Sequence, residues 1–318
     1  MSGRRSLKML VVLMVLASGS AAAQGSGKPG QQTSTANIPI EGLTIGQLSG
    51  CSATIWGVYG LPDRSEEPGQ WVGSAFGIGA LGDTLFMFTN RHCLGIDDFV
   101  SSGAVLTEAD QYGLFIEFPS GEIRQVDQCG FYMVSGMNMD LAVLTVDIGG
   151  LIEGYDYTLV PIYPLDDLQV GDEVAASGSP ADVSSVYAGT VTFGRVSAFR
   201  ELDGTPVIQV DASVNHGNSG GPLLVERADH YYCVGVNAWG PMTETIEGIS
   251  FAIDIRRSGN ILQTGEIMFF RADGPGLCRA LADAGYEGAV VQDAPLLPPP
   301  RGRRVSTGAS AGGARRVD

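Results

Sequence analysis

The most reactive pattern in the chain is a serine set among glycines and a proline, in the stretch Val214-Asn-His-Gly-Asn-Ser-Gly-Gly-Pro222. Glycine adopts backbone conformations that other residues avoid and lets the chain approach another group closely. A turn of this composition can direct two backbone N–H groups at one point, which stabilises the negative oxygen that forms during acyl transfer. Many tight turns share the composition without any chemistry, so Ser219 needs partners elsewhere in the chain.

A serine hydroxyl needs a neighbouring base before it can attack a carbonyl, and that base is usually a histidine. The chain has three histidines. His92 ends an apolar strand pattern, where a side chain can reach a cleft. His216 is only three residues before Ser219 and too close along the backbone to accept its proton easily, while His230 lies in a polar turn. The sequence therefore favours His92 as the base.

An acid must orient that histidine, and Asp140 is the best placed carboxylate. It stands directly before the apolar segment 141–146, at the edge of a predicted strand. A carboxylate there either pairs with another group or caps a turn. The alternatives, Asp97, Asp98 and Asp147, lie in polar loops.

The elements that must position these residues are short strands. Apolar and β-branched segments bounded by turn residues predict strands at 73–78, 84–89, 113–118, 141–146, 173–176, 188–193, 207–210, 231–236 and 248–252. A helical pattern is convincing only near residues 275–284. Many short strands without regular helices between them indicate an all-β sandwich or barrel. The segments form two groups, before about residue 150 and after about residue 160.

Three motifs together resemble the catalytic blocks of trypsin-like serine proteases, and most nearly the bacterial HtrA/Deg branch. They are Thr89-Asn-Arg-His92, Asp140-Leu-Ala-Val143 and Gly217-Asn-Ser-Gly-Gly-Pro222. Flanking segments such as Gly73-Ser-Ala-Phe76 and Gly194-Arg-Val-Ser197 also match the family. The resemblance covers about residues 46–257. It implies the chymotrypsin fold, which is all-β with two six-stranded antiparallel barrels and a short C-terminal helix expected to pack on the second barrel.

The resemblance also implies a role for each residue. Ser219 is expected to be the nucleophile, His92 the general base and acid, and Asp140 the residue that orients the imidazole. The N–H groups of Gly217 and Ser219 would form the oxyanion hole. Residues expected to contact substrate are Ser213, His216, Val236, Asn237, Ala238, Trp239 and Gly240. A neutral Ser213, where trypsin-type enzymes carry an aspartate, implies a small or medium apolar residue before the cleaved bond (P1).

The chain departs from the family pattern at several positions. Ala238 replaces a serine that helps to hold the aspartate, so Asp140 needs another hydrogen-bond partner. His216 stands where HtrA-like sequences usually have proline, and is either an exposed turn residue or a source of pH sensitivity. Only about 60 residues follow Ile253, too few for the PDZ module that HtrA proteins usually carry there.

Composition and the termini indicate an exported protein. Residues 1–23 have the basic start, short apolar run and small-residue exit of a secretory signal peptide. Their removal would take away three basic and no acidic residues, which changes the net charge from −16 to −19. That charge argues against nucleic acid as a partner and either serves solubility or steers basic substrates. No other segment is long and apolar enough to span a membrane, so the mature protein is expected in the periplasm or outside the cell.

The cysteines indicate no metal site. Cys51, Cys93, Cys129, Cys233 and Cys278 lack metal-ligand spacing, and no cofactor is expected. Export permits disulfides, and Cys93 could pair with Cys51 or Cys129, but an odd count leaves at least one thiol outside any intrachain pair.

The expected domain order is a signal peptide (1–23), a flexible lead-in (24–45), an N-terminal barrel (46–150), a C-terminal barrel with the helix (151–290) and a disordered tail (291–318). The expected function is an exported serine endopeptidase acting on proteins or peptides. Two alternatives stay open, a catalytically silent homologue that binds peptides and an α/β-hydrolase esterase. The second requires the chain order Ser, Asp, His and a parallel sheet, whereas the order here is His, Asp, Ser. The sequence leaves the oligomeric state open.

Overall fold

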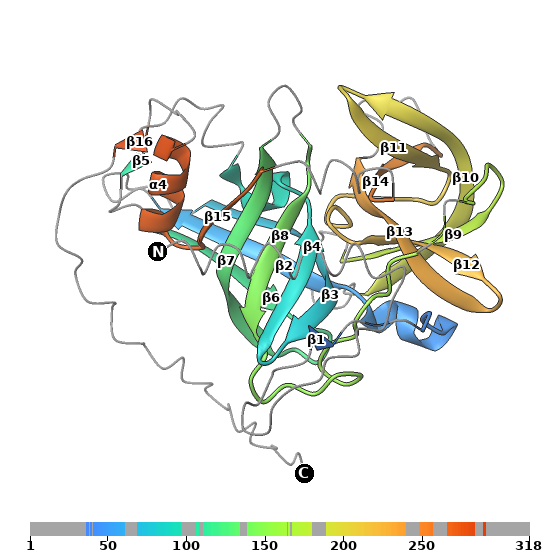
Figure 1. Cartoon of the computed structure of the whole chain (residues 1–318), viewed down its shortest axis with the longest axis horizontal. Coiled ribbons are helices and arrows are strands. Elements are labelled where there is room, and N and C mark those ends of the chain that lie inside the picture. The colour runs from blue at the N-terminus through green and yellow to red at the C-terminus, as the bar shows by residue number, and fades with distance from the viewer. Residues whose placement is uncertain are drawn as a thin grey trace, which may run out of the picture.

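A computed structural model describes residues 36–37, 39, 41–60, 69–96, 106–107, 111–133, 139–163, 165, 167–179, 189–239, 248–256, 266–283 and 289–290. Two antiparallel β-barrels lie side by side in it (Figure 1). The predicted fold class, two six-stranded barrels and a short C-terminal helix, is confirmed. The signal peptide and the C-terminal tail lie outside the described residues.

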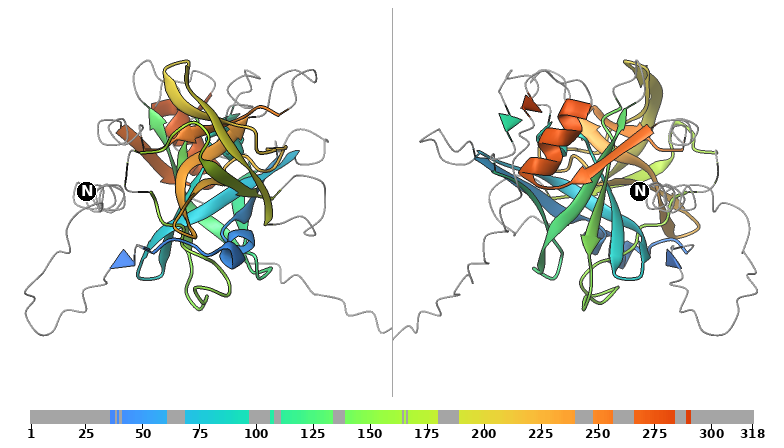
Figure 2. Two further views of the ribbon diagram at one scale, coloured as in Figure 1. Left: turned by 90° about the vertical axis from the view of Figure 1, so that its right-hand side faces the viewer. Right: turned by 60° about the vertical axis from the view of Figure 1, so that its left-hand side comes forward.

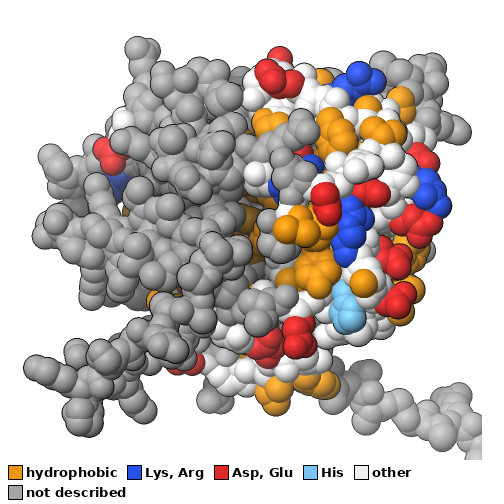
Figure 3. Space-filling model, turned by 45° about the vertical axis from the view of Figure 1, so that its right-hand side comes forward, with side chains coloured by type: hydrophobic (Ala, Val, Ile, Leu, Met, Phe, Trp, Pro, Cys, Tyr) orange, Lys and Arg blue, Asp and Glu red, His pale blue; other side chains and the backbone are white. Residues whose placement is uncertain are grey.

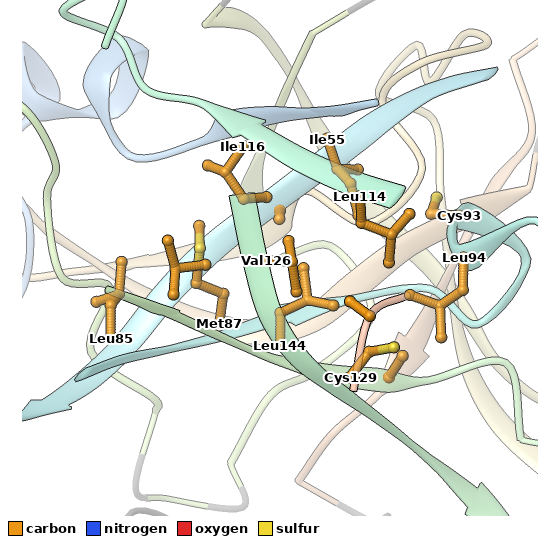
Figure 4. Close-up of a cluster of buried hydrophobic side chains, with 14 of the residues drawn as sticks. Ile55, Leu85, Met87, Cys93, Leu94, Leu114, Ile116, Val126, Cys129 and Leu144 are labelled. Atoms are coloured by element: carbon orange, nitrogen blue, oxygen red, sulfur yellow. The ribbon is translucent and has the colours of Figure 1, made fainter. Parts of the chain in front are cut away.

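The first barrel is a ring of six strands. It comprises β2 (Ala53–Gly60), β3 (Gly69–Leu81), β4 (Thr84–Thr89), β6 (Gln111–Glu117), β7 (Ile123–Met133) and β8 (Ala142–Asp147). Pairing of β3 with β4 closes the ring, because β4 also pairs with β8 at the other end of the sheet. Figure 4 shows apolar side chains from several of these strands, among them Ile55, Leu85, Leu114, Val126 and Leu144, meeting in its core.

The second barrel is closed in the order β10-β11-β14-β13-β12-β9. Its strands are β9 (Glu173–Gly178), β10 (Thr190–Leu202), β11 (Thr205–Val210), β12 (Pro222–Arg227), β13 (His230–Trp239) and β14 (Ser250–Asp254). Its core contains Val174, Val196, Ile208, Leu223 and Val234. Figure 3 shows acidic and fewer basic side chains dispersed over the described part of one face of the molecule.

An apolar layer joins the two barrels. Phe76 and Phe88 from the first barrel belong to the same buried cluster as Leu224, Val236 and Ile253 from the second. Their burial removes apolar surface from water, which is the main favourable contribution to such packing. This shared layer fixes the two barrels against each other, so side chains from the two halves of the chain can meet at their junction.

Some residues of the segment predicted as a lead-in (24–45) contact the barrels. The short strand β1 (Ala36–Asn37) pairs with β3. Leu43 is buried and exchanges two backbone hydrogen bonds with Tyr231, of 2.9 and 2.8 Å. The 3-10 helix η1 (Ile45–Gly50) follows directly. The N-terminal segment is thus attached to both barrels before β2 begins.

The C-terminal helix forms where predicted but packs on the other barrel. Helix α4 (Gly274–Asp283) begins where the Asp273 carboxylate accepts the N–H of Gly276 at 2.7 Å, an N-cap that supports the first turn. The preceding strand β15 (Glu266–Arg271) pairs with β7, which carries the helix to the first barrel (Figures 1 and 2). Leu277 and Leu281 lie in the first barrel's core. The expectation that this helix packs on the second barrel is wrong.

Two small features complete the described structure. Strands β5 (Leu106–Thr107) and β16 (Ala289–Val290) form a short parallel pair beside α4. No helix in the described part of the chain is long and apolar enough to cross a membrane.

Because Leu277 is only 1% exposed inside the first barrel's core, its replacement by alanine leaves a cavity there. We expect Leu277→Ala to lower the free energy of unfolding by about 2–5 kcal/mol. Urea denaturation measures this change, and Asp283→Asn at the exposed end of the same helix should shift it by less than about 0.5 kcal/mol. In Leu277→Ala, compared with the wild type, amide hydrogen exchange should show loss of protection first in β15 and β7. Loss confined to strands of the second barrel contradicts the packing described here.

Candidate active site

Ser219 lies in a turn that leads directly into β12. Gly217 has φ of +91° and Gly220 has φ of +88°, in the left-handed region that favours glycine. A Cβ atom on Gly220 would lie 2.0 Å from the carbonyl oxygen of Ser74, so the turn is pressed against β3 of the other barrel. The glycines therefore allow both the conformation of the turn and its close approach to the first barrel.

Backbone hydrogen bonds use most of the amides in this turn. The N–H groups of Asn218, Gly220 and Gly221 donate to the carbonyls of Asn215, Asn237 and Asn218, at 3.0, 2.8 and 3.0 Å. Among the described residues, no carbonyl accepts the N–H of Gly217 or Ser219. These are the two amides expected from the sequence to form an oxyanion hole. Donors left open in this way are available to a bound oxygen.

Strand register brings His92 and Asp140 together. Strands β4 and β8 are antiparallel, with Thr89 opposite Ala142, so the residues just after β4 lie beside those just before β8. His92 begins the 3-10 helix η2 (His92–Leu94). Its Nδ1 lies 2.7 Å from Oδ2 of Asp140, and its backbone N–H donates to Oδ1 at 2.9 Å.

The second of these bonds supplies the partner that Asp140 needs in place of the missing serine at position 238. Both carboxylate oxygens are engaged by the same residue, His92. The buried side chain of Asn90 adds a hydrogen bond from Nδ2 to the Asp140 carbonyl at 2.8 Å. The carboxylate is thereby held in one orientation against the imidazole.

The same contact changes the protonation behaviour of His92. Burial is the largest single effect and lowers the pKa of this imidazole. The hydrogen bonds to the Asp140 carboxylate and to Cys93, with the charges of these two groups, together outweigh burial and raise the pKa from 6.5 to about 11. The Asp140 side chain is 14% exposed and that of His92 39% exposed. The ring thus has one edge on the carboxylate and is partly exposed to solvent.

The Ser219 hydroxyl is hydrogen-bonded to a backbone carbonyl and not to the imidazole in this structure. Its Oγ donates a hydrogen bond to the carbonyl of Ala238 at 2.9 Å. The serine is nevertheless close to the base, because its own carbonyl lies 3.5 Å from Sγ of Cys93, the residue after His92. Catalytic hydrogen bonds are often long or unformed in the absence of substrate. The Ser219 hydroxyl has to exchange its Ala238 partner before it can bond to Nε2 of His92.

The residues expected to bind substrate fall into two groups. Ser213 and His216 are exposed, and the backbone carbonyl of Ser213 accepts a hydrogen bond from Thr192. Val236, Asn237 and Ala238 have buried side chains, so only their backbone can face a substrate. The side chain of Trp239 and all of Gly240 lie outside the described part of the structure.

Asn237 has a structural use that the sequence did not reveal. Its Nδ2 donates to the carbonyls of Ser177 and Pro222, at 3.1 and 3.2 Å, and its backbone exchanges hydrogen bonds with Gly220 and Gly221. Asn237 therefore holds the serine turn through hydrogen bonds to the backbone of Gly220 and Gly221.

In the described part of the chain the structure shows no disulfide, and all five cysteines are buried. Cys93 does not pair with Cys51 or Cys129. A Cβ atom on Gly73 would lie 2.6 Å from its sulfur, so this thiol fills the space beside a glycine. Burial raises the pKa of Cys51 to about 12 and also raises that of Cys233. Such thiols are poor nucleophiles and pack as small apolar groups.

Comparison with known proteins agrees with this geometry. A family profile described as a trypsin-like peptidase domain matches residues 73–236, which include His92, Asp140 and Ser219. The chain belongs to this family. Its relatives are HtrA/Deg serine proteases, as the sequence motifs predicted. The α/β-hydrolase alternative is wrong, because both barrels are antiparallel and the described chain has one α-helix.

Two relatives and one solved structure illustrate the similarity. Serine endoprotease DegS of Escherichia coli is 29% identical over 187 residues, or 56% of this chain and 44% of DegS. Chloroplastic Protease Do-like 5 of Arabidopsis thaliana is 36% identical over 244 residues, 71% of this chain and 64% of that relative. A crystal structure of a serine endoprotease from Yersinia pestis is 24% identical, with a TM-score of 0.44 over 67% of this chain and 62% of that one. The chain thus spans less than two thirds of each.

The contact between His92 and Asp140 predicts a measurable titration. The negative carboxylate stabilises the imidazolium form, so the His92 midpoint should lie above 6.5 and Asp140→Asn should lower it by about 1–3 pH units. Proton NMR suits this measurement, since His216 and His230 are the only other histidines and act as internal controls. A His92 midpoint at or below 6.5 that Asp140→Asn does not move would show that the carboxylate has no such effect.

Proposed function

We propose that the protein is a serine endopeptidase in which Ser219, His92 and Asp140 form the catalytic triad. One observation carries the proposal: a histidine bonded to a carboxylate stands beside a serine turn whose two open amides are those of Gly217 and Ser219. Each part alone is common, whereas their combination at the junction of two barrels is what acyl transfer requires. The family match and the serine endoprotease relatives support it.

The arrangement assigns a task to each atom. Ser219 Oγ attacks the carbonyl carbon of the peptide bond while Nε2 of His92 accepts its proton. Nδ1–H donates to Asp140, which fixes the tautomer and stabilises the imidazolium. The carbonyl oxygen becomes negative and accepts the N–H groups of Gly217 and Ser219. His92 then protonates the departing amine, and water hydrolyses the acyl-enzyme by the same steps.

The hydrogen bond from Ser219 to Ala238 adds one condition. The Ser219 hydroxyl donates its hydrogen bond to the Ala238 carbonyl. It has to break this bond before it can donate to His92 and be activated. Rotation about one side-chain bond is fast compared with typical turnover. The bond therefore describes a resting orientation of the hydroxyl that turnover can leave.

The substrate class we propose is proteins or peptides with a small or medium apolar P1 residue. An extended substrate pairs through its backbone with an exposed strand edge, while pockets select side chains. The exposed Ser213 carries no charge that could pair with a lysine or arginine. His216 is exposed and directly precedes Gly217, one of the two residues proposed to form the oxyanion hole. We propose that its side chain contacts a bound substrate at the edge of the site.

Export is part of the proposal and rests on the sequence of residues 1–23. N-terminal sequencing of the protein recovered outside the cytoplasm should begin at Gln24. Recovery of the chain with Met1 or Ser2 intact from the cytoplasm alone contradicts export.

A fluorophosphonate probe tests the nucleophile directly. The wild-type protein should be labelled on Ser219 and should cleave casein, while Ser219→Ala should lose labelling and about 10⁶-fold in kcat. Substitution of Ser197, a serine of β10 outside the turn, by alanine serves as control and should leave both unchanged. Absence of labelling in the folded wild-type protein would favour the silent peptide-binding homologue.

Profiling with a library of synthetic peptides tests the substrate preference. Because position 213 lacks a carboxylate, we expect cleavage after Ala, Val or Leu to exceed cleavage after Arg or Lys by at least about 10-fold in kcat/KM. Ser213→Asp should shift the preference toward Arg and Lys, with Ser213→Asn as the uncharged control. Strong cleavage after Arg or Lys by the wild-type protein contradicts the assignment.

A further inference from the structure

Ser74 of β3 is buried beneath the active site and uses all its polar atoms. Its hydroxyl donates to the Gly217 carbonyl at 2.6 Å and accepts the N–H of Ser179 at 2.8 Å. Its own N–H donates to the Ser219 carbonyl at 2.7 Å. Its carbonyl accepts the hydroxyl of Thr89, also at 2.7 Å. One residue of the first barrel thus holds two carbonyls of the serine turn, which belongs to the second: its hydroxyl holds that of Gly217 and its backbone N–H that of Ser219.

These two contacts fix the direction of the amides between them. A peptide group is planar and trans, so holding its carbonyl also sets where the following N–H points. Ser74 holds the carbonyls of Gly217 and Ser219, and the N–H groups that follow them are bonded to Asn215 and Asn237. The peptide group that carries the Ser219 N–H lies between these two fixed planes. The directions open to the Ser219 N–H are therefore restricted by the contacts on either side of it.

Ser74 also connects this turn to the strand that carries the base. Thr89, which bonds to the Ser74 carbonyl, is fully buried and ends β4, three residues before His92. A Cβ atom on Gly220 would lie 2.0 Å from the Ser74 carbonyl oxygen and 2.4 Å from the Thr89 hydroxyl. The backbone of the turn therefore lies directly against these two residues, and any side chain at position 220 would clash with both.

We propose that Ser74 is a positioning residue for catalysis: it holds the oxyanion turn in the conformation that leaves the Gly217 and Ser219 amides open. It acts through the two carbonyls of the turn and does not touch the substrate. The inference rests on the proposed endopeptidase function. A merely structural serine would contribute to stability and leave the rate of the chemical step unchanged, which gives the two roles different kinetic signatures.

Ser177 offers a matched control. It is also a fully buried serine, and its hydroxyl donates to the Leu48 carbonyl at 3.1 Å and pairs with Ser52 at 3.1 Å. That hydroxyl faces η1 and not the serine turn. Ser177→Ala therefore removes a comparable buried hydroxyl from the same region of the fold while leaving the contacts of Gly217 and Ser219 intact.

The test compares steady-state cleavage of one peptide by the wild-type, Ser74→Ala and Ser177→Ala proteins, each below its unfolding temperature. Ser74→Ala leaves the Gly217 carbonyl and the Ser179 N–H buried without their partner, and we expect kcat to fall about 10- to 100-fold with KM changed less than about threefold. Affinity for a peptide boronate, whose oxygen occupies the oxyanion position, should fall by a similar factor. Ser177→Ala should keep kcat within about threefold.

The pH profile provides a further readout. The midpoint of kcat/KM should be the same in Ser74→Ala and the wild type, because the contact between His92 and Asp140 is untouched. Thr89→Val, which removes only the hydroxyl bonded to Ser74, should lower kcat less than Ser74→Ala and in the same sense. If Ser74→Ala does not fold, kcat of Thr89→Val is the measurement that tests the proposal.

Three outcomes overturn the inference: kcat of folded Ser74→Ala within threefold of the wild type, equal losses of kcat in Ser74→Ala and Ser177→Ala, or unfolded Ser74→Ala together with unchanged kcat in Thr89→Val. A wild-type protein that cleaves no peptide and resists fluorophosphonate labelling instead overturns the proposed function. The two failures are distinguishable, because the first set is observed in an active enzyme.

Discussion

The requirement that dominates this structure is that a turn of one barrel must be held by hydrogen bonds from the other. Buried peptide groups need partners, and at the barrel junction the carbonyls of Gly217 and Ser219 find theirs on Ser74. Asn237 satisfies amides on the opposite side of the same turn. Among the described residues, the amides left without a backbone acceptor in this turn are those of Gly217 and Ser219. Chemistry and folding are thus linked, because the pattern of satisfied groups determines which donors remain for a substrate.

The second half of the site follows from strand register and electrostatics. Pairing of β4 with β8 places His92 beside Asp140, and both carboxylate oxygens are then engaged by that one histidine. The His92 backbone N–H gives the Asp140 carboxylate a second donor, which the side chain of Ala238 cannot supply. The Ala238 carbonyl receives the Ser219 hydroxyl.

Much of this was readable from the sequence, and the exceptions have physical reasons. Segment 84–89 was predicted with the bounds that β4 has, because a run of apolar and β-branched residues follows a turn. Strand β7 was missed because Arg124, Asp127 and Gln128 interrupt its apolar pattern. The helix was predicted but assigned to the wrong barrel. An amphipathic pattern shows that one face of a helix is buried, but it does not show which barrel that face packs against. Ser74 belongs to the motif Gly73-Ser-Ala-Phe76, but its contact with Gly217 joins residues 143 positions apart. A local sequence pattern cannot predict such a contact.

The most direct measurement is a crystal structure of the protein with a peptide aldehyde or boronate bound to Ser219. The account predicts that the oxygen of the adduct lies about 2.7–3.1 Å from the nitrogens of both Gly217 and Ser219, with the Ser74 contacts retained and the Ser219 side chain turned away from Ala238. An adduct oxygen directed to solvent, with either amide bonded to a protein carbonyl, would contradict the account.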